Sequence, residues 1–105
     1  MSQPDYPAQV AVRDLVVLDA ALDEAIAVGL SKLTRENIAK RAGVSTGTVS
    51  HCAPMWQLKD AVVKRAVAME ILSIVAQAIV DGHPAARLAP DELRARALAS
   101  MLAES

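Results

Sequence analysis

Aromatic residues are almost absent from this sequence of 105 residues, which has no phenylalanine and only Tyr6 and Trp56. Hydrophobic residues still make up 53% of the chain, and Ala, Val, Leu and Ile supply most of them. Ala and Leu are strong helix formers, whereas strands are enriched in aromatic residues. The composition therefore predicts an all-α fold and argues against a β-sandwich.

Cysteine is nearly absent too, since Cys52 is the single one. An internal disulfide is thereby excluded, which fits a reducing cytoplasm. We expect Cys52 to be a small buried hydrophobic residue and not a reactive thiol. Cys52, His51 and His83 do not have the spacing of metal ligands, so we expect no metal and no other cofactor.

Long apolar runs are missing as well. The longest, residues 66–80, contains Glu70 and Gln77 and is too short to cross a bilayer. The polar, proline-bearing residues 1–9 lack the basic start of a signal peptide and are interpreted as a flexible arm. We expect a cytoplasmic protein with no membrane partner.

Positive charge is concentrated in the middle of the chain, although the net charge is only −1. Residues 32–65 hold seven basic and two acidic side chains. Residues 1–31 hold one base and five acids, and residues 66–105 three bases and five acids. A basic segment between acidic ones is the electrostatic pattern that a phosphate backbone selects.

That basic segment includes residues 35–54, which have the pattern of a helix-turn-helix. Ile38 and Ala42 share the inner face of a first helix because they are four positions apart. Gly43 follows, where a left-handed conformation can end the helix cheaply. Ser45 is placed to cap a second helix.

The second helix has an inner and an outer face. Val49 and Cys52 are expected to face back toward Ile38, whereas the outer residues are short or polar. The candidates for contact with base edges are Thr46, Gly47, Thr48 and His51. The candidates for contact with phosphates are Thr34, Arg35, Ser45, Ser50 and Lys59.

A long first helix is predicted before this motif, from residue 10 or 12 to residue 28. Its proposed inward stripe consists of Leu15, Leu18, Leu22, Ala25 and Ile26. The acidic side chains of the helix are interpreted as a solvated face. Gly29 is predicted to end it, and Thr34 to cap the next helix.

The run VLDAALDEAIAVGLSKLTRENIAKRAGVSTGTVSH, residues 17–51, resembles the N-terminal DNA-binding domain of the TetR family of bacterial repressors. Its most specific part has the form AxRAGVSxGTV. The shorter segment IAKRAGVSTGTVS also resembles Lac-repressor-type domains, but those begin with the helix-turn-helix, and the long preceding helix favours TetR. The resemblance implies a homodimer on a double-stranded DNA operator. TetR-like proteins carry a large C-terminal ligand-binding domain, for which two further helices leave no room, so no small-molecule ligand is expected.

The end of the motif departs from the family pattern. Ser50, Cys52 and Ala53 stand where TetR-like recognition helices carry aromatic residues or histidine. We expect Lys59 to supply the phosphate-binding charge of the following loop. Trp56 is interpreted as a packing residue that replaces the missing phenylalanine, with direct DNA contact as the alternative.

The C-terminal half is predicted to form two helices. Residues 55–80 read as one long helix, apolar on nearly all faces beyond residue 65, and such a helix needs cover from a partner. A last amphipathic helix begins at Pro90. The proposed dimer interface consists of Ile71, Leu72, Val75, Ile79, Leu98, Met101 and Leu102.

The sequence thus predicts an all-α protein of about five helices. A flexible arm (residues 1–9) would precede a DNA-binding domain (10–57) and a continuous dimerisation region (58–105). The predicted function is that of a homodimeric repressor on a pseudo-palindromic operator. The alternative is a protein-interaction adaptor or antirepressor that uses the helix-turn-helix as a scaffold. We expect no enzyme, because no catalytic constellation or phosphate-cradling glycine loop is found.

Overall fold

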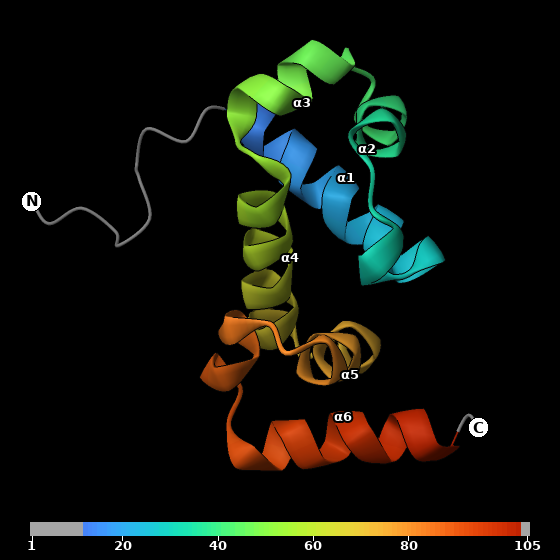
Figure 1. Cartoon of the computed structure of the whole chain (residues 1–105), viewed down its shortest axis with the longest axis vertical. Helices are drawn as coiled ribbons and strands as arrows, with labels where there is room; N and C mark the ends of the chain where they lie inside the picture. The colour runs from blue at the N-terminus through green and yellow to red at the C-terminus, as the bar shows by residue number, and fades with distance from the viewer. Residues whose placement is uncertain (1–11, 104–105) are drawn as a thin grey trace, which may run out of the picture.

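The computed structural model describes residues 12–103, and within them the chain is all-helical, without strands (Figure 1). The predicted arm at residues 1–9 lies outside the described residues. The α-helices are α1 (Val12–Val28), α2 (Arg35–Ala42), α3 (Thr46–Cys52), α4 (Met55–Met69), α5 (Leu72–Asp81) and α6 (Asp91–Ala103). Two short 3₁₀ helices join them, η1 (Leu30–Lys32) and η2 (Pro84–Leu88). The predicted all-α class is confirmed, with six α-helices in place of about five.

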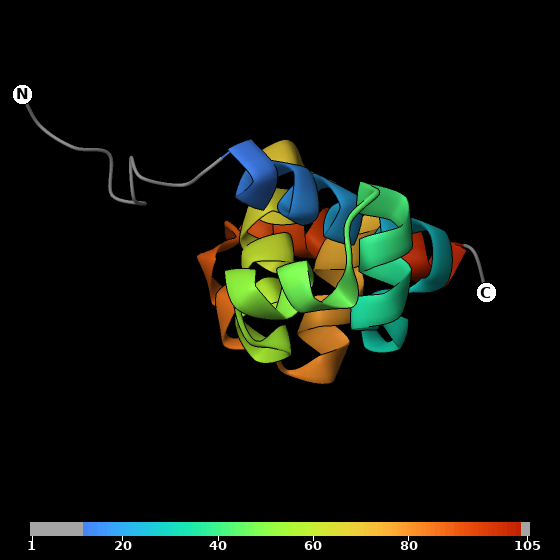
Figure 2. The same cartoon turned by 90° about the horizontal axis from the view of Figure 1, so that it is seen from above.

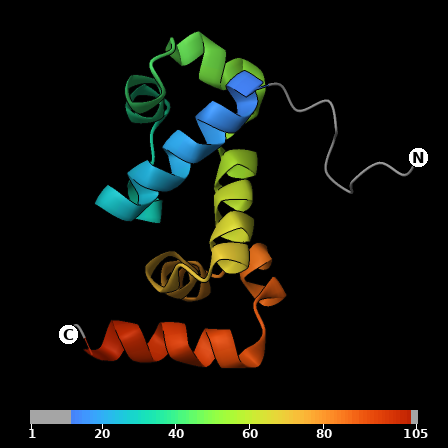
Figure 3. The same ribbon diagram turned by 180° about the vertical axis from the view of Figure 1, so that it is seen from behind.

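The helices form two groups joined by α4 (Figure 1). We call α1, η1, α2 and α3 the reading unit, and α5, η2 and α6 the base layer. Figure 3 shows α1 lying across the upper part of α4, whose lower end meets the base layer. The body measures 38 × 37 × 18 Å. Its thickness is less than two helix diameters of about 10–12 Å, so many helices are covered on one side only.

Helix α1 ends before Gly29 as predicted, but its inward stripe was predicted wrongly at both ends. Leu15 and Ile26 are exposed, and Leu18 is only half-buried. The buried face is instead rich in small residues, with Val17, Ala20, Ala21, Leu22 and Ala25. Small side chains allow α2 and α4 to approach α1 closely, which larger residues in the stripe would prevent.

The helix predicted over residues 55–80 is interrupted. Glu70 adopts a left-handed conformation with φ 55° and ends α4, and Ile71 is extended. Arg96 of α6 donates a hydrogen bond to the Glu70 carboxylate at 3.1 Å. The break turns α5 back against α6 and η2, so that apolar residues which a straight helix would expose are buried within the subunit.

One hydrophobic cluster links the reading unit to the base layer. Leu30, Ile38, Val49, Val62 and Ile74 are its largest fully buried members from successive elements. Burial of a side chain of this size contributes about 1.5–3 kcal/mol. The boundary predicted between residues 57 and 58 lies inside α4, which packs on both groups. None of the helices described is long and apolar enough to cross a membrane.

Candidate nucleic-acid interface

The turn between α2 and α3 has the predicted caps. Thr34 accepts a hydrogen bond from the Asn37 amide at 3.1 Å and so caps the start of α2. Gly43 ends α2 with φ 73°, a conformation that L side chains adopt only with strain. The Val44 amide then donates to the Ala39 carbonyl at 3.0 Å, as in a helix ending with glycine. The turn brings α3 across α2.

Ser45 caps α3 as predicted. Its hydroxyl accepts a hydrogen bond from the Thr48 amide at 3.1 Å, and the two hydroxyls of Ser45 and Thr48 lie 3.0 Å apart. Val49 is fully buried and packs into the core. These contacts fix the rotation of α3 about its own axis.

That rotation leaves one polar face of α3 open to solvent. Thr46, Gly47, Ser50 and His51 are exposed, at positions that share one side of a helix. Thr48 is half-buried, and its hydroxyl is engaged with Ser45. In the view from above, α3 lies beside α2 (Figure 2), and Figure 1 shows both at the end of the molecule remote from α6. The predicted base contacts therefore share an unobstructed helix, with Thr48 at its edge.

The last residue of α3 is tied to α1. The Cys52 thiol donates a hydrogen bond to the Asp14 carboxylate at 2.8 Å. Cys52 is half-buried, so the prediction of a small buried hydrophobic residue was only partly right. No local pattern in the sequence indicates this bond, because 38 residues separate its partners.

The basic residues around the motif divide into paired and unpaired ones. Three of the seven bases in residues 32–65 form ion pairs: Arg41 with Glu24 at 2.9 Å, Lys64 with Asp60 at 3.0 Å and Arg65 with Asp19 at 2.7 Å. Within the described residues, the remaining four, Lys32, Arg35, Lys40 and Lys59, form no ion pair. Lys32 belongs to η1, which lies at the end of α1 away from α3 (Figure 1). The unpaired charge near α3 thus comes from Arg35, Lys40 and Lys59.

The predicted phosphate contacts come from three elements around α3. Thr34 and Arg35 stand at the start of α2, Ser45 and Ser50 belong to α3 and its cap, and Lys59 lies in the second turn of α4. The Arg35 Nε atom is buried and has no hydrogen-bond partner within the part of the chain described. Thr34 and Ser45 already accept hydrogen bonds from backbone amides, whereas the exposed Ser50 is in no such bond.

Trp56 differs from its predicted packing role. Its side chain is 71% exposed in the first turn of α4, directly after the loop that leaves α3. The core beneath is filled without it, by Leu58 and Val62 of the same helix. The alternative, a residue available to DNA, is the one compatible with this exposure.

The predicted dimer residues lie on α5 and α6 and in the segment before α5. Leu98, Met101 and Leu102 are exposed on α6, whereas Ile71, Leu72 and Ile79 are half-buried. Val75 is fully buried inside the subunit, so its assignment to a surface was wrong. It was misplaced because the sequence predicts one continuous helix, apolar on nearly all faces, that would need cover from a partner.

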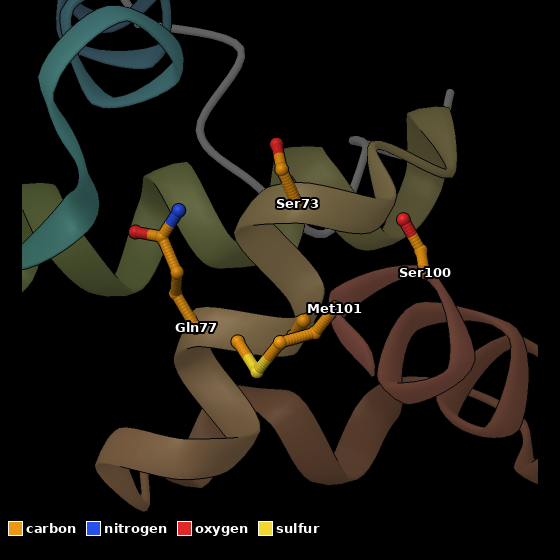
Figure 4. A pocket seen from close by; sticks show the side chains of 5 residues that line it. Ser73, Gln77, Ser100 and Met101 are labelled. Carbon is orange, nitrogen blue, oxygen red and sulfur yellow. The ribbon is translucent and has the colours of Figure 1, made fainter. Parts of the chain in front are cut away.

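A small cavity lies between α5 and α6. Its volume is about 80 Å³, and Ser73, Ala76, Gln77, Ser100 and Met101 line it (Figure 4). A second, wide-open depression of about 370 Å³ lies beside α1 and α2 and is lined by Glu24, Asn37, Lys40 and Arg41. Ligand pockets typically measure about 300–1,000 Å³ and are mainly apolar. The first is too small for such a ligand, and the second is an open depression lined by charged and amide side chains.

Two crossed helices with glycine in the turn, a capped second helix and an exposed polar face on it define a helix-turn-helix DNA-binding domain. Residues 17–52 match the family model described as bacterial regulatory proteins, tetR family. The match covers 36 of the 105 residues, from α1 to the end of α3, and it supports a TetR-type helix-turn-helix and a role in DNA binding and transcription regulation. The match ends at Cys52, the last residue of α3. No curated protein and no solved structure was found to be similar to the chain.

Proposed function

We propose that the protein is a repressor that binds a pseudo-palindromic operator as a homodimer in the bacterial cytoplasm and needs no small-molecule effector. The exposed polar face of α3, which is capped by Ser45 at its start and bonded to α1 through Cys52 at its end, is the observation that carries this proposal. A short helix fixed in this way can enter a major groove without losing its packing on α1 and α2.

In the proposed complex, α3 reads the bases. Thr46, Gly47 and His51 reach base edges, with Thr48 at the edge of the contact. The helix carries few long hydrogen-bond donors, so contact of threonine methyl groups with thymine and the shape of the groove supply much of the specificity. The phosphates are bound by Thr34, Arg35, Ser45, Ser50 and Lys59. Trp56 joins this second group, since its exposed indole N–H is a donor.

The proposed dimer forms through the base layer. Leu98, Met101 and Leu102 expose apolar surface on α6, at the end of the molecule opposite α3. A two-fold axis there leaves both α3 helices free to enter successive major grooves, with half-site centres about 34–36 Å or a longer in-phase distance apart. Ile71, Leu72 and Ile79 complete the interface from beside α6.

The proposed lack of an effector pocket is supported by the size of the cavity between α5 and α6. At about 80 Å³ it is several times smaller than a typical ligand site. Regulation would then follow the concentration of the protein, because dimerisation and operator binding both depend on it.

Selection of bound fragments from random double-stranded DNA tests the function most directly. We expect a site with two inverted half-sites, and a gel shift on it that weakens as salt rises. A variant with Thr46, Ser50 and His51 all replaced by alanine is expected to lose this shift. A matched control replaces the exposed Ser73 of α5 by alanine and is expected to keep it.

The alternative function predicts a different result. An adaptor or antirepressor that uses the helix-turn-helix as a scaffold would select no common sequence at any salt concentration. If the selected site has no inverted symmetry, the DNA-binding function stands but the homodimer is refuted.

A further inference from the structure

The reading unit is attached to the base layer at two places. The first is α4, whose upper part packs on α1 and whose lower part packs on α5 and η2. The second is a direct contact of α5 with η1 and the end of α1. A body held by a single helix can tilt about it, and an attachment away from that helix limits the tilt. The second contact therefore determines how firmly the reading unit is oriented.

One hydrogen bond lies at the centre of the second contact. The Leu30 amide donates to the Gln77 side-chain carbonyl oxygen at 2.6 Å, across 47 residues of sequence. Leu30 is fully buried and opens η1, where Gly29 provides no side-chain cap. Gln77 therefore supplies the acceptor that a residue of η1 would normally find locally.

The surroundings of Gln77 make this bond specific. Gln77 is half-buried on α5, and its amide points away from Met101 in the adjoining cavity (Figure 4). Gly29 lies beside it, because a Cβ atom placed on Gly29 would be 3.6 Å from the same carbonyl oxygen. The neighbouring α5 residues Val75, Ala76 and Ala78 are buried and apolar, so they offer no alternative acceptor.

We propose that Gln77 is a positioning residue, which sets the angle between the reading unit and the base layer and thereby the half-site spacing that the dimer accepts. This inference rests on the proposed function, namely a dimer formed through the base layer. In such a dimer the base layers are joined, and α3 lies at the opposite end of a subunit that extends 38 Å. A small rotation at the contact of η1 and α5 is amplified at α3, which must meet a groove at a fixed distance from its copy.

The test uses the full chain and the selected operator, with its two half-sites moved apart or together by one base pair. The wild-type protein is expected to lose about tenfold in affinity for each altered spacing. Gln77→Met removes the acceptor at similar length, and Gln77→Asn shortens the side chain out of reach. Both are expected to bind the three spacings within about threefold of one another while binding an isolated half-site like the wild type.

Two variants serve as controls. Gln77→Glu keeps an acceptor oxygen and is expected to keep the spacing preference. Arg96→Met removes the hydrogen bond from α6 to Glu70, at the junction of α4 and α5, and leaves η1 unchanged. This variant is also expected to keep the spacing preference. If Arg96→Met relaxes the preference as much as Gln77→Met, a general loosening of the base layer explains the effect and the proposal is overturned.

Amide hydrogen exchange at Leu30 gives a second readout that needs no DNA. We expect slow exchange in the wild type and in Gln77→Glu, and exchange at least about tenfold faster in Gln77→Met and Gln77→Asn. Fast exchange in the wild type, or an unchanged spacing preference in both acceptor-free variants, overturns the role of Gln77 while the proposed function stands. A wild-type protein that selects no DNA refutes the proposed function itself, and the spacing role with it, whatever the exchange at Leu30.

Discussion

Glu24 and Arg41 form an ion pair whose members differ in exposure. The Glu24 side chain is 8% exposed and the Arg41 side chain 42%, with 2.9 Å between Oε1 and Nε. A carboxylate that is largely buried depends on its partner, whereas a half-exposed guanidinium can be hydrated instead. Loss of Arg41 should therefore destabilise the contact of α1 with α2 more than loss of the Glu24 charge does.

We predict that Arg41→Met destabilises the protein more than Glu24→Gln. The first leaves a buried carboxylate without its partner and is expected to lower the free energy of unfolding by about 2–3 kcal/mol. The second keeps an oxygen that can accept from Arg41 and is expected to cost no more than about 1 kcal/mol. Urea denaturation measures both. The double variant should be more stable than Arg41→Met alone, and the reverse order would contradict this account.

His51 and Lys59 should affect DNA binding in different ways. His51→Ala is expected to weaken operator binding by about 1–3 kcal/mol, because a base contact is lost. Binding to random DNA should change little. Lys59→Ala is expected to weaken both and to reduce the salt slope by about one unit, because a phosphate contact is lost. Titrations at several salt concentrations separate the two. Equal losses on operator and random DNA would place His51 on a phosphate.

The outer face of α3 could be predicted from sequence, but some of its supports could not. Ser45, Gly43 and Val49 act within a few residues of one another, so local spacing determines their roles. The bond of Cys52 to Asp14 depends on how α1 crosses α3, which no local pattern reveals. Trp56 was misjudged for a related reason, since the core closes without a large aromatic residue.

At the scale of the helix, the junction of α4 and α5 is held in an unfavourable backbone conformation. Glu70 has φ 55° and ψ 45°, a region that costs a residue other than glycine about 1–2 kcal/mol. Its side chain bonds to Arg96, but both partners are at least half exposed, and such a pair contributes only about 0–1 kcal/mol. A glycine at position 70 would have indicated the end of α4, but the sequence has a glutamate there.

Glu70→Gly is therefore predicted to raise the free energy of unfolding, by about 0.5 kcal/mol, because relief of the backbone exceeds the loss of the pair. Glu70→Ala keeps the strain and loses the same pair, so it is expected to lower the free energy of unfolding by up to about 1 kcal/mol. Thermal and urea denaturation of both variants check the order. Alanine more stabilising than glycine would show that the conformation carries no strain.

The same junction explains why the helix over residues 55–80 was predicted as one. Apolar residues continue through the break, and periodicity alone does not reveal a reversal in which both halves stay buried. The turn at Gly43 was predictable because its residue type and its conformation agree. A helix end could thus be located where the residue type suits the backbone conformation, as at Gly43. The hydrophobic pattern alone did not locate it.

At the scale of the whole molecule, α6 packs chiefly on α5 at one end of the subunit, and within the described residues its opposite side is uncovered (Figure 1). Leu93 and Ala97 face inward and are buried, whereas Leu102 is 74% exposed. Apolar side chains gathered on one exposed helix indicate an interaction surface, and in the proposed dimer this surface contacts another copy.

Leu102→Glu is predicted to dissociate the dimer without unfolding the subunit. Because a two-fold interface contains the residue twice, loss of about 1.5 kcal/mol per copy raises the dissociation constant about a hundredfold. Ile26→Glu is the matched control, since Ile26 is 50% exposed on α1, away from the base layer. Sedimentation equilibrium measures the dissociation constant, and circular dichroism verifies the fold. We expect Ile26→Glu to remain dimeric and Leu102→Glu to bind single half-sites only. Dissociation by Ile26→Glu alone would place the interface on α1 and would require a different arrangement of the two α3 helices on DNA.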